Sequence, residues 1–117
     1  MPTNQRICVD LGTTTPVRKI RVVNHHNHAT WEAIRGVRNT RIYVTAADPS
    51  AAYNANVSAD TLVFDGQVSA NDYSNGGATW QDLALSRSLR GRYVVFDFAT
   101  NWGATDVMCV RRIEIGS

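Results

Sequence analysis

The side chains best suited to binding a ligand lie in two polar segments, residues 24–36 and 101–106. The first segment carries imidazoles, amides and a guanidinium, and the second places a tryptophan on an Asn-Trp-Gly turn. Amides and imidazoles form hydrogen bonds with hydroxyl groups, and an aromatic ring can stack on a sugar ring. The sequence therefore predicts a hydroxyl-binding site at one end of the fold, with these candidate residues: Asn24, His25, Asn27, His28, Trp31, Arg35, Asn101 and Trp102.

The run from residue 24 to 28 has a second interpretation, a metal site, because it holds His25, His26 and His28. Imidazole is the commonest metal ligand, and His26 and His28 would share one side of an extended segment. However, no carboxylate lies within the run, and Glu32 is the nearest. We therefore favour hydroxyl recognition or a solvated loop, and we expect neither a metal nor another cofactor.

Each tryptophan also has a purely structural interpretation. Trp102 is either a stacking platform or a half-buried ring packed beneath its loop. Trp31 is either a second platform or the plug that holds the long polar loop to the rest of the domain. Trp80 lies in a strand-like context and is expected in the core.

Catalytic patterns are missing from the sequence. The aspartates at positions 48, 60, 65, 72 and 106 lie in turn-like contexts, where aspartate usually organises the backbone. No nucleophile elbow, phosphate-binding glycine loop or metalloprotease helix is present. Cys8 and Cys109 lie in apolar stretches with no histidine beside them, so we expect free, buried, inert thiols. The chain is therefore predicted not to be an enzyme.

Short strands must position the two polar segments. Alternating apolar and polar residues predict strands at 7–12, 17–23, 37–45, 61–64, 79–85, 92–98 and 110–115. Turns are expected at 13–16 and 65–66, loops at 46–58 and 71–77, and about one helical turn at 30–35. The pattern predicts a single all-β sandwich domain over residues 1–117, with about eight strands in a jelly roll.

The same alternation assigns the faces of the strands. Arg41 and Tyr43 are expected to point outward from their strand, and Val95 and Asp97 lie on the face opposite the core. The predicted core consists of apolar residues at every second position: Val9, Leu11, Ile20, Val22, Ile42, Val44, Val94, Phe96, Phe98, Ile113 and Ile115.

Charge and hydropathy exclude several classes of protein. The net charge is +2, from 12 basic and 10 acidic residues, and the arginines are dispersed, so we do not expect nucleic acid as a partner. No apolar run approaches the roughly 20 residues that span a bilayer, so no membrane insertion is expected. The first residues contain no apolar signal-peptide core.

Three ordered segments resemble the discoidin family, also called coagulation factor 5/8 type C domains, of the galactose-binding-like jelly rolls. The first is Val-Asp-Leu-Gly at 9–12 followed by Val-Arg-Lys-Ile at 17–20. The second is the strand 36–45. The third runs from Arg-Tyr-Val-Val-Phe-Asp at 92–97 through Asn-Trp-Gly at 101–103 to Ile-Glu-Ile at 113–115. The resemblance implies a jelly roll that recognises ligands through loops at one end.

Two departures from the family limit what the resemblance implies. Family members usually carry a further segment ahead of the first strand, which often binds calcium, and that segment is not seen here, so calcium is not carried over. Arg112 stands where the family commonly has glutamate. Without that segment, an exposed sheet edge or apolar patch is expected.

Two functions follow as expectations. The first is a non-catalytic recognition module that binds a glycan or a cell-surface polysaccharide. The alternative is a structural or decoration subunit of a larger assembly, such as the capsid or tail of a bacteriophage virion, with other protein subunits or further copies of itself as partners. A virion protein reaches the cell exterior without a signal peptide, which would place this chain on a virion surface or in another extracellular assembly.

Overall fold

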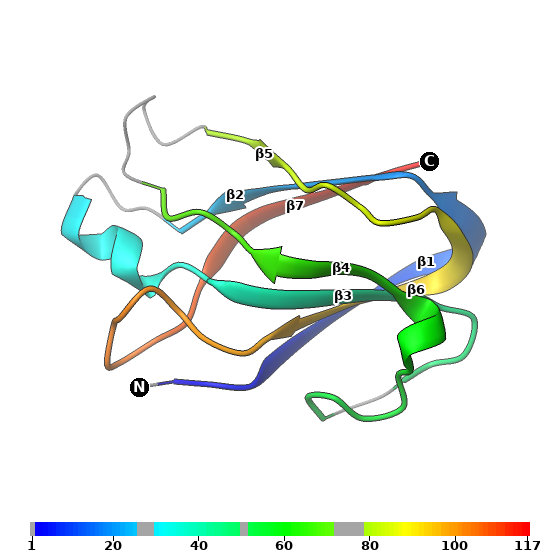
Figure 1. The fold of residues 1–117 in the computed structure, drawn as a ribbon, viewed down its shortest axis with the longest axis horizontal. Coiled ribbons are helices and arrows are strands. Elements are labelled where there is room, and N and C mark those ends of the chain that lie inside the picture. Colours follow the sequence, from blue (N-terminus) through cyan, green and yellow to red (C-terminus); the bar gives the residue numbers. More distant parts are fainter. Residues whose placement is uncertain (1, 26–29, 50–51, 72–78) are drawn as a thin grey trace.

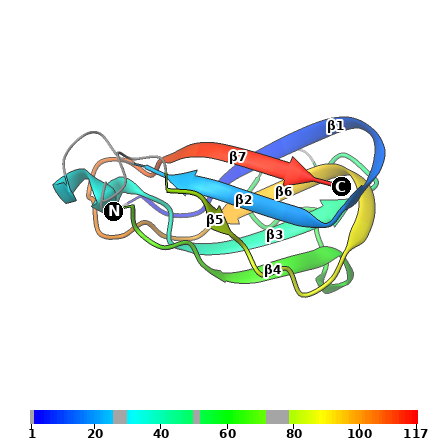
Figure 2. The same cartoon turned by 90° about the horizontal axis from the view of Figure 1, so that it is seen from above.

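A computed structural model of the protein describes residues 2–25, 30–49, 52–71 and 79–117, and in Thr30, Trp31 and Glu32 only the backbone. The structure is all-β and consists of two antiparallel sheets that lie one above the other, consistent with a β-sandwich (Figures 1 and 2). Within these ranges it has seven strands, against the roughly eight expected. The strands are β1 (Gln5–Val17), β2 (Lys19–Asn24), β3 (Asn39–Thr45), β4 (Leu62–Gln67), β5 (Gln81–Asp82), β6 (Leu89–Phe98) and β7 (Val110–Gly116).

The four-stranded sheet has the order β1-β6-β3-β4, and the three-stranded sheet has the order β5-β2-β7. Two short 3-10 helices complete the described elements, η1 (Thr30–Arg35) and η2 (Ala59–Thr61). Helix η1 and the loop between β6 and β7 lie at one end of the molecule, whereas η2 lies near the other end (Figure 1). The single helical turn expected at 30–35 is therefore confirmed.

The hydrophobic core lies between the two sheets. Seven predicted core residues are buried in it: Ile20, Val22, Ile42, Val44, Val94, Phe96 and Phe98. The other four, Val9, Leu11, Ile113 and Ile115, are only partly buried and pack against the cluster. These four come from β1 and β7, which each have a strand on one side only among the described residues, so their side chains have fewer neighbours.

Two predicted turns are wrong. The segment 13–16 belongs to β1, which accommodates it by a shift of register between Asp10 and Thr15. Gly12 has a φ of 82° there, and its N–H donates to the Asp10 carboxylate over 2.8 Å, so the expected turn is an irregularity within a strand. Asp65-Gly66 likewise lies inside β4, paired with Arg41 and Thr40.

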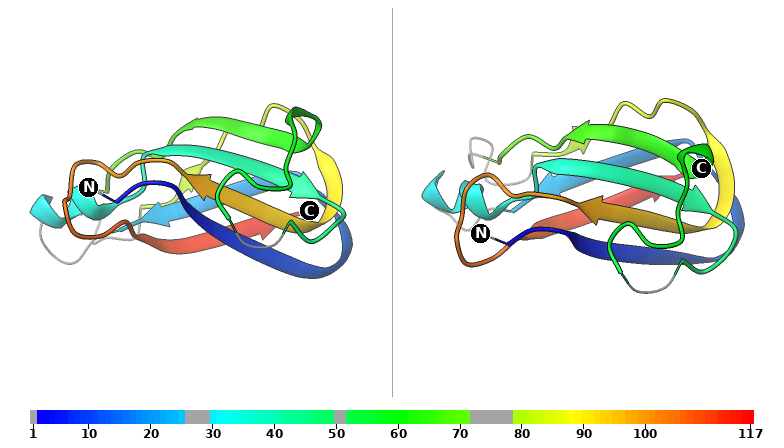
Figure 3. Two further views of the ribbon diagram at one scale, coloured as in Figure 1. Left: turned by 90° about the horizontal axis from the view of Figure 1, so that it is seen from below. Right: turned by 60° about the horizontal axis from the view of Figure 1, so that its bottom comes forward.

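Three side chains have an environment other than the expected one. Tyr43 was expected outside but is 5% exposed, and the described part of the loop between β3 and η2 lies over that face (Figure 3). Cys8 was expected to be buried but is exposed on the edge strand β1, and both Cys8 and Cys109 are free. Trp80 is half-buried, with the Arg21 guanidinium 4.2 Å from its ring centre, and is not part of the core cluster.

Replacing Gly91 by alanine should destabilise the protein by about 1 to 3 kcal/mol, as expected for overpacking. A Cβ atom on Gly91 would lie 2.7 Å from the Val44 side chain and 2.8 Å from the Thr45 carbonyl oxygen, so neighbouring backbone would have to move. Urea denaturation measures the change. Gly103→Ala is a poor control, because Gly103 has a positive φ that alanine disfavours. The control is therefore Ala84→Gly on the exposed surface. Equal destabilisation by Gly91→Ala and Ala84→Gly would contradict the prediction.

Candidate functional site

The two polar segments predicted to bind a ligand do meet at one end of the sandwich. Trp102 N–H bonds to the carbonyl groups of Ile34 and Gly36, and Cys109 N–H bonds to that of Arg35. The segment after β6 is thus held to η1 and to the residues that follow it. The expectation from the sequence that these two segments lie together is therefore confirmed. Their side chains differ in whether they face outward or into the protein.

Two of the predicted site residues, Asn24 and Asn101, face inward and hold the loops in place. Asn24 is fully buried; its amide donates to Val37 and Ser69 over 2.8 and 3.0 Å, and its oxygen accepts two backbone N–H groups. Asn101 is 2% exposed and donates to Ala104 and Val107. Since both amides are buried and bonded within the protein, they have a structural role in place of the ligand contact expected of them.

Trp102 is half-buried beneath its loop, which is the structural alternative to an exposed ring on which a sugar could stack. Its indole N–H donates to the carbonyl oxygen of Val68 over 2.8 Å. The Arg38 guanidinium lies 4.5 Å from the ring centre and so covers one face of the ring. A sugar could therefore not stack on that face without displacing Arg38.

The other candidates at this end are less closely defined. Arg35 is partly exposed and pairs with Asp106 at 2.9 Å, and His25 is partly buried, with its backbone N–H bonded to Asn24. The predicted residues Asn27 and His28, and with them His26, lie outside the described residues. Trp31 belongs to η1, and the structure describes its backbone but not its side chain. In the described ranges no three His, Cys, Asp or Glu side chains cluster as metal ligands would.

A second and better-defined site lies on the outer face of the four-stranded sheet. It is a hollow of about 310 Å³, here called the outer hollow, lined by Asn39, Thr40, Arg41, Tyr53, Asp65, Gly66, Gln67, Asp97 and Ala99. Its volume falls at the lower end of the range for small-molecule sites, about 300–1,000 Å³. Its lining comes from β3, β4, β6, the residue directly after β6 and the loop that follows β3. This site was not predicted from the sequence.

The floor of the outer hollow is built by strand register. Arg41 of β3 is opposite Asp97 of β6 on one side and opposite Asp65 of β4 on the other. Arg6 of β1 is in turn opposite Asp97. Basic and acidic residues therefore alternate in one row across all four strands, which is the favourable arrangement for cross-strand pairs.

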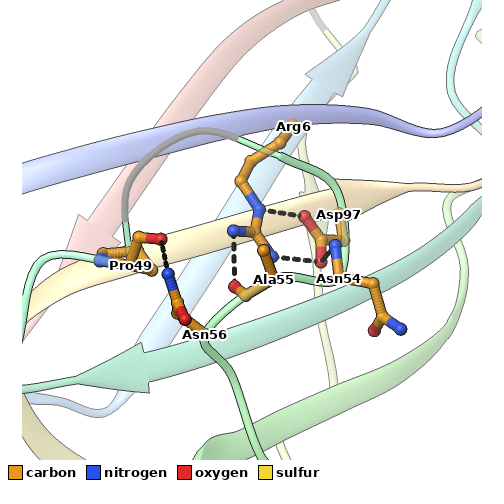
Figure 4. A network of polar contacts seen from close by, with 6 residues as sticks. All are labelled: Arg6, Pro49, Asn54, Ala55, Asn56 and Asp97. Carbon is orange, nitrogen blue, oxygen red and sulfur yellow. Dashed lines mark hydrogen bonds and ion pairs between the residues drawn. The ribbon is translucent and has the colours of Figure 1, made fainter.

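The loop that follows β3, described at residues 46–49 and 52–58 and here called the covering loop, lies over the outer face of the sheet (Figure 3) and contributes Tyr53 to the wall of the outer hollow. Its attachment is a buried ion pair, drawn in Figure 4: Asp97 accepts hydrogen bonds from the Arg6 guanidinium and from the Asn54 N–H, and Arg6 also donates to the Ala55 carbonyl. Both side chains of the pair are at most 3% exposed. This attachment holds Tyr53 beside the hollow.

The charged side chains of the outer hollow differ in whether they can contact a ligand. The Arg41 Nε atom lies 3.4 Å from the Asp65 Oδ2 atom. The two side chains are 52% and 56% exposed, so both can contact a ligand. The charge of Asp65 raises the pKa of Arg41, which stays protonated at any physiological pH. Burial raises the pKa of Tyr43, which lies on the same face, so this phenol is neutral. The Asp97 carboxylate is already bonded to the Arg6 guanidinium, so Asp97 forms part of the wall of the hollow and is less available to bind a ligand.

The lining of the outer hollow can recognise a polar ligand through hydrogen bonds. Guanidinium, carboxylate and amide groups from Arg41, Asp65, Asn39 and Gln67 provide both donors and acceptors over a small area. The Tyr53 ring provides an apolar surface beside them. One signal in the sequence could have pointed to this face: Asp97 is a charged residue within the otherwise apolar run 94–98, which indicates a specific polar partner.

Comparisons with protein-family models and with curated proteins found no match to this chain. In the ranges that the structure describes, no helix is long and apolar enough to cross a membrane.

Proposed function

We propose that the protein is a non-catalytic recognition module that binds a carbohydrate, on a jelly roll of the galactose-binding-like, discoidin type. The observation that carries the proposal is the outer hollow, where exposed Arg41 and Asp65 lie beside amides and a tyrosine. Adjacent sugar hydroxyls both donate and accept hydrogen bonds, and this lining has complementary groups for them. The ordered segments that resemble the discoidin family favour the same class of ligand, by analogy only.

The position that we propose for the site differs from the one suggested by the sequence alone. At the loop end, Asn24 and Asn101 are used within the protein and Arg38 covers one face of Trp102. The outer hollow instead combines exposed charged groups with an aromatic wall. We therefore place the glycan in the outer hollow and keep the loop end, through His25 and Arg35, as the site to be tested against it.

A glycan array followed by titration calorimetry should find a sugar whose affinity falls at least about tenfold in the variants Arg41→Ala and Tyr53→Ala, since each loses about 1 to 2 kcal/mol of contact. Matched controls are Arg21→Ala, an exposed arginine paired with Glu114 on the other sheet, and Tyr93→Ala, a partly exposed tyrosine on β6. Loss of binding only in His25→Ala and Arg35→Ala would move the site to the loop end. Absence of binding across the array would contradict the proposed function.

The second candidate function is a structural or decoration subunit of a larger assembly, such as a virion. Both sheets end in strands that pair on one side only within the described chain, and Ile7, Ile34 and Val107 are 38%, 43% and 39% exposed. Such edges can be completed by a strand from a neighbouring subunit. Size-exclusion chromatography with light scattering tests this function, because it requires an oligomer, whereas a monomer at all concentrations that binds a glycan supports the first.

A further inference from the structure

Among the residues that the structure describes, no strand pairs with the outer edge of β1 along its regular part, residues 5–10. This strand is the end of the four-stranded sheet and pairs only with β6 among the described residues. Cys8 is exposed on its outer face, and Ile7, beside it, is 38% exposed. An edge strand with exposed apolar side chains can pair with another strand. The details of β1 indicate which one.

The direction of the backbone groups follows from the hydrogen bonds of β6. Ala99 N–H bonds to the Asn39 carbonyl oxygen, so the backbone groups of the preceding residue, Phe98, point away from β3 and toward β1. Phe98 is opposite Gln5, whose groups therefore point toward β6. Since the direction alternates along a strand, the N–H and C=O of Cys8 point to the outer edge of β1.

We propose that the protein forms a homodimer in which the β1 strands of two copies pair antiparallel about a two-fold axis at Cys8. In this register Cys8 faces Cys8 of the second copy, and Arg6 faces Asp10. Moving the axis by one residue to Ile7 would place Arg6 opposite Cys8, and moving it to Val9 would place Cys8 opposite Asp10. Only the axis at Cys8 pairs the two charges of opposite sign.

The charge pattern of the sheet supports this register. Within one copy the row Arg6, Asp97, Arg41 and Asp65 already alternates in sign across the four strands. Asp10 of the second copy would stand opposite Arg6 in this row and continue the alternation. The Arg6 side chain is buried and stays bonded to Asp97, so the two charges favour this register without forming a direct ion pair. Asp10 is bonded to Arg92 of its own copy, and this guanidinium lowers the pKa of Asp10 to about 2, so the carboxylate is charged at neutral pH.

The inner face of β1 is also complementary to a second copy. Beside the strand is a hollow of about 180 Å³, here called the edge hollow. Its lining is part polar and part apolar and consists of Gln5, Arg6, Ile7, Val37, Phe98, Met108 and Val110. With the axis at Cys8, Val9 of the second copy lies opposite Ile7 at the mouth of this hollow. Both apolar side chains lose contact with water in the dimer, which favours association.

Cysteine cross-linking tests both the dimer and its register. Opposed residues in a hydrogen-bonded antiparallel pair have Cα atoms about 5.5 Å apart, which is within the range for a disulfide. Oxidised glutathione is the oxidant: two Cys8 thiols form one disulfide, and each glutathione disulfide is reduced to two thiols. Partial burial raises the pKa of the Cys8 thiol, so the reaction is run at about pH 9 to increase the thiolate fraction.

In the Cys109→Ser variant we expect a covalent dimer, and light scattering under reducing conditions should already give twice the monomer mass of 12.9 kDa. A second variant, Asp10→Ser with Cys109→Ser, keeps Cys8 and measures how far loss of the Asp10 charge alone slows cross-linking. The matched control is Asp10→Cys with both native cysteines replaced by serine. It keeps the cysteine on the same face and edge, but two residues from the axis on each strand. The pair is then about 13 Å apart, and we expect cross-linking at least tenfold slower.

Blocking the edge provides an independent measurement. Ile7→Lys introduces a charge at the mouth of the edge hollow, where Val9 of the second copy would pack, and should give a monomer. Ile34→Lys, at a similarly exposed isoleucine in η1, should remain dimeric. The proposal is overturned by a wild-type monomer at all concentrations, by equal cross-linking at positions 8 and 10, or by an unchanged dimer in Ile7→Lys. The proposed dimer would be one contact within the assembly function, but it does not depend on that function. A dimer that binds a glycan would support the dimer and not the assembly function. An assembly without this dimer would support the assembly function and not the dimer.

Discussion

Replacing Asp97 by alanine should lower the free energy of unfolding by about 3 to 5 kcal/mol, the usual cost of removing one partner from a buried ion pair. Asp97 is 2% exposed and accepts hydrogen bonds from the Arg6 guanidinium and the Asn54 N–H. Its removal leaves the Arg6 charge buried without its carboxylate and releases the covering loop from the sheet. Urea denaturation followed by circular dichroism measures the change.

The matched control is Asp65→Ala, which removes the other acidic residue of the same charge row. Its pair with Arg41 is more than half exposed, so the cost should be at most about 1 kcal/mol. Replacing both Arg6 and Asp97 by leucine should cost less than Asp97→Ala alone, because no charge remains buried. Equal destabilisation by Asp97→Ala and Asp65→Ala would show that the buried pair does not hold the covering loop.

Asn24→Ala should destabilise the protein by about 3 kcal/mol, since several buried backbone groups lose a hydrogen-bond partner at once. The amide bonds to backbone groups of His25, Val37 and Ser69, and so joins the end of β2 to two separate segments. Asn39→Ala is the control: this exposed amide bonds only to Thr100 among the described contacts of its side chain, and the change should stay within about 0.5 kcal/mol.

A double variant identifies the mechanism of the Asn24 effect. A Cβ atom added to Gly36 would lie 2.6 Å from the Asn24 side-chain oxygen, so Gly36→Ala alone should be strongly destabilising. With Asn24 already alanine, that oxygen is gone and Gly36→Ala should cost much less. Additive effects of the two substitutions would show that Asn24 does not pack and bond in this position.

The sequence alone predicted the buried face of the inner strands. The alternation of Val94, Phe96 and Phe98, and that of Ile20 and Val22, identified core positions correctly, because a strand turns every second side chain to the same face. It also predicted that the polar segments flanking η1 and following β6 meet. These features depend on local periodicity and on the order of the strands, and both can be read along the chain.

The tertiary structure alone decided which polar residues are available to a ligand. Asn24 and Asn101 have the residue type of a sugar site, yet both are buried, and nothing in their local pattern distinguishes the two roles. Tyr43 and Asp97 follow the alternation of outward-facing residues, yet the covering loop buries them. The contact that holds this loop joins Arg6 to Asp97, which are 91 residues apart. Periodicity gives the direction of a side chain from its strand, but what lies over that face depends on contacts between distant segments.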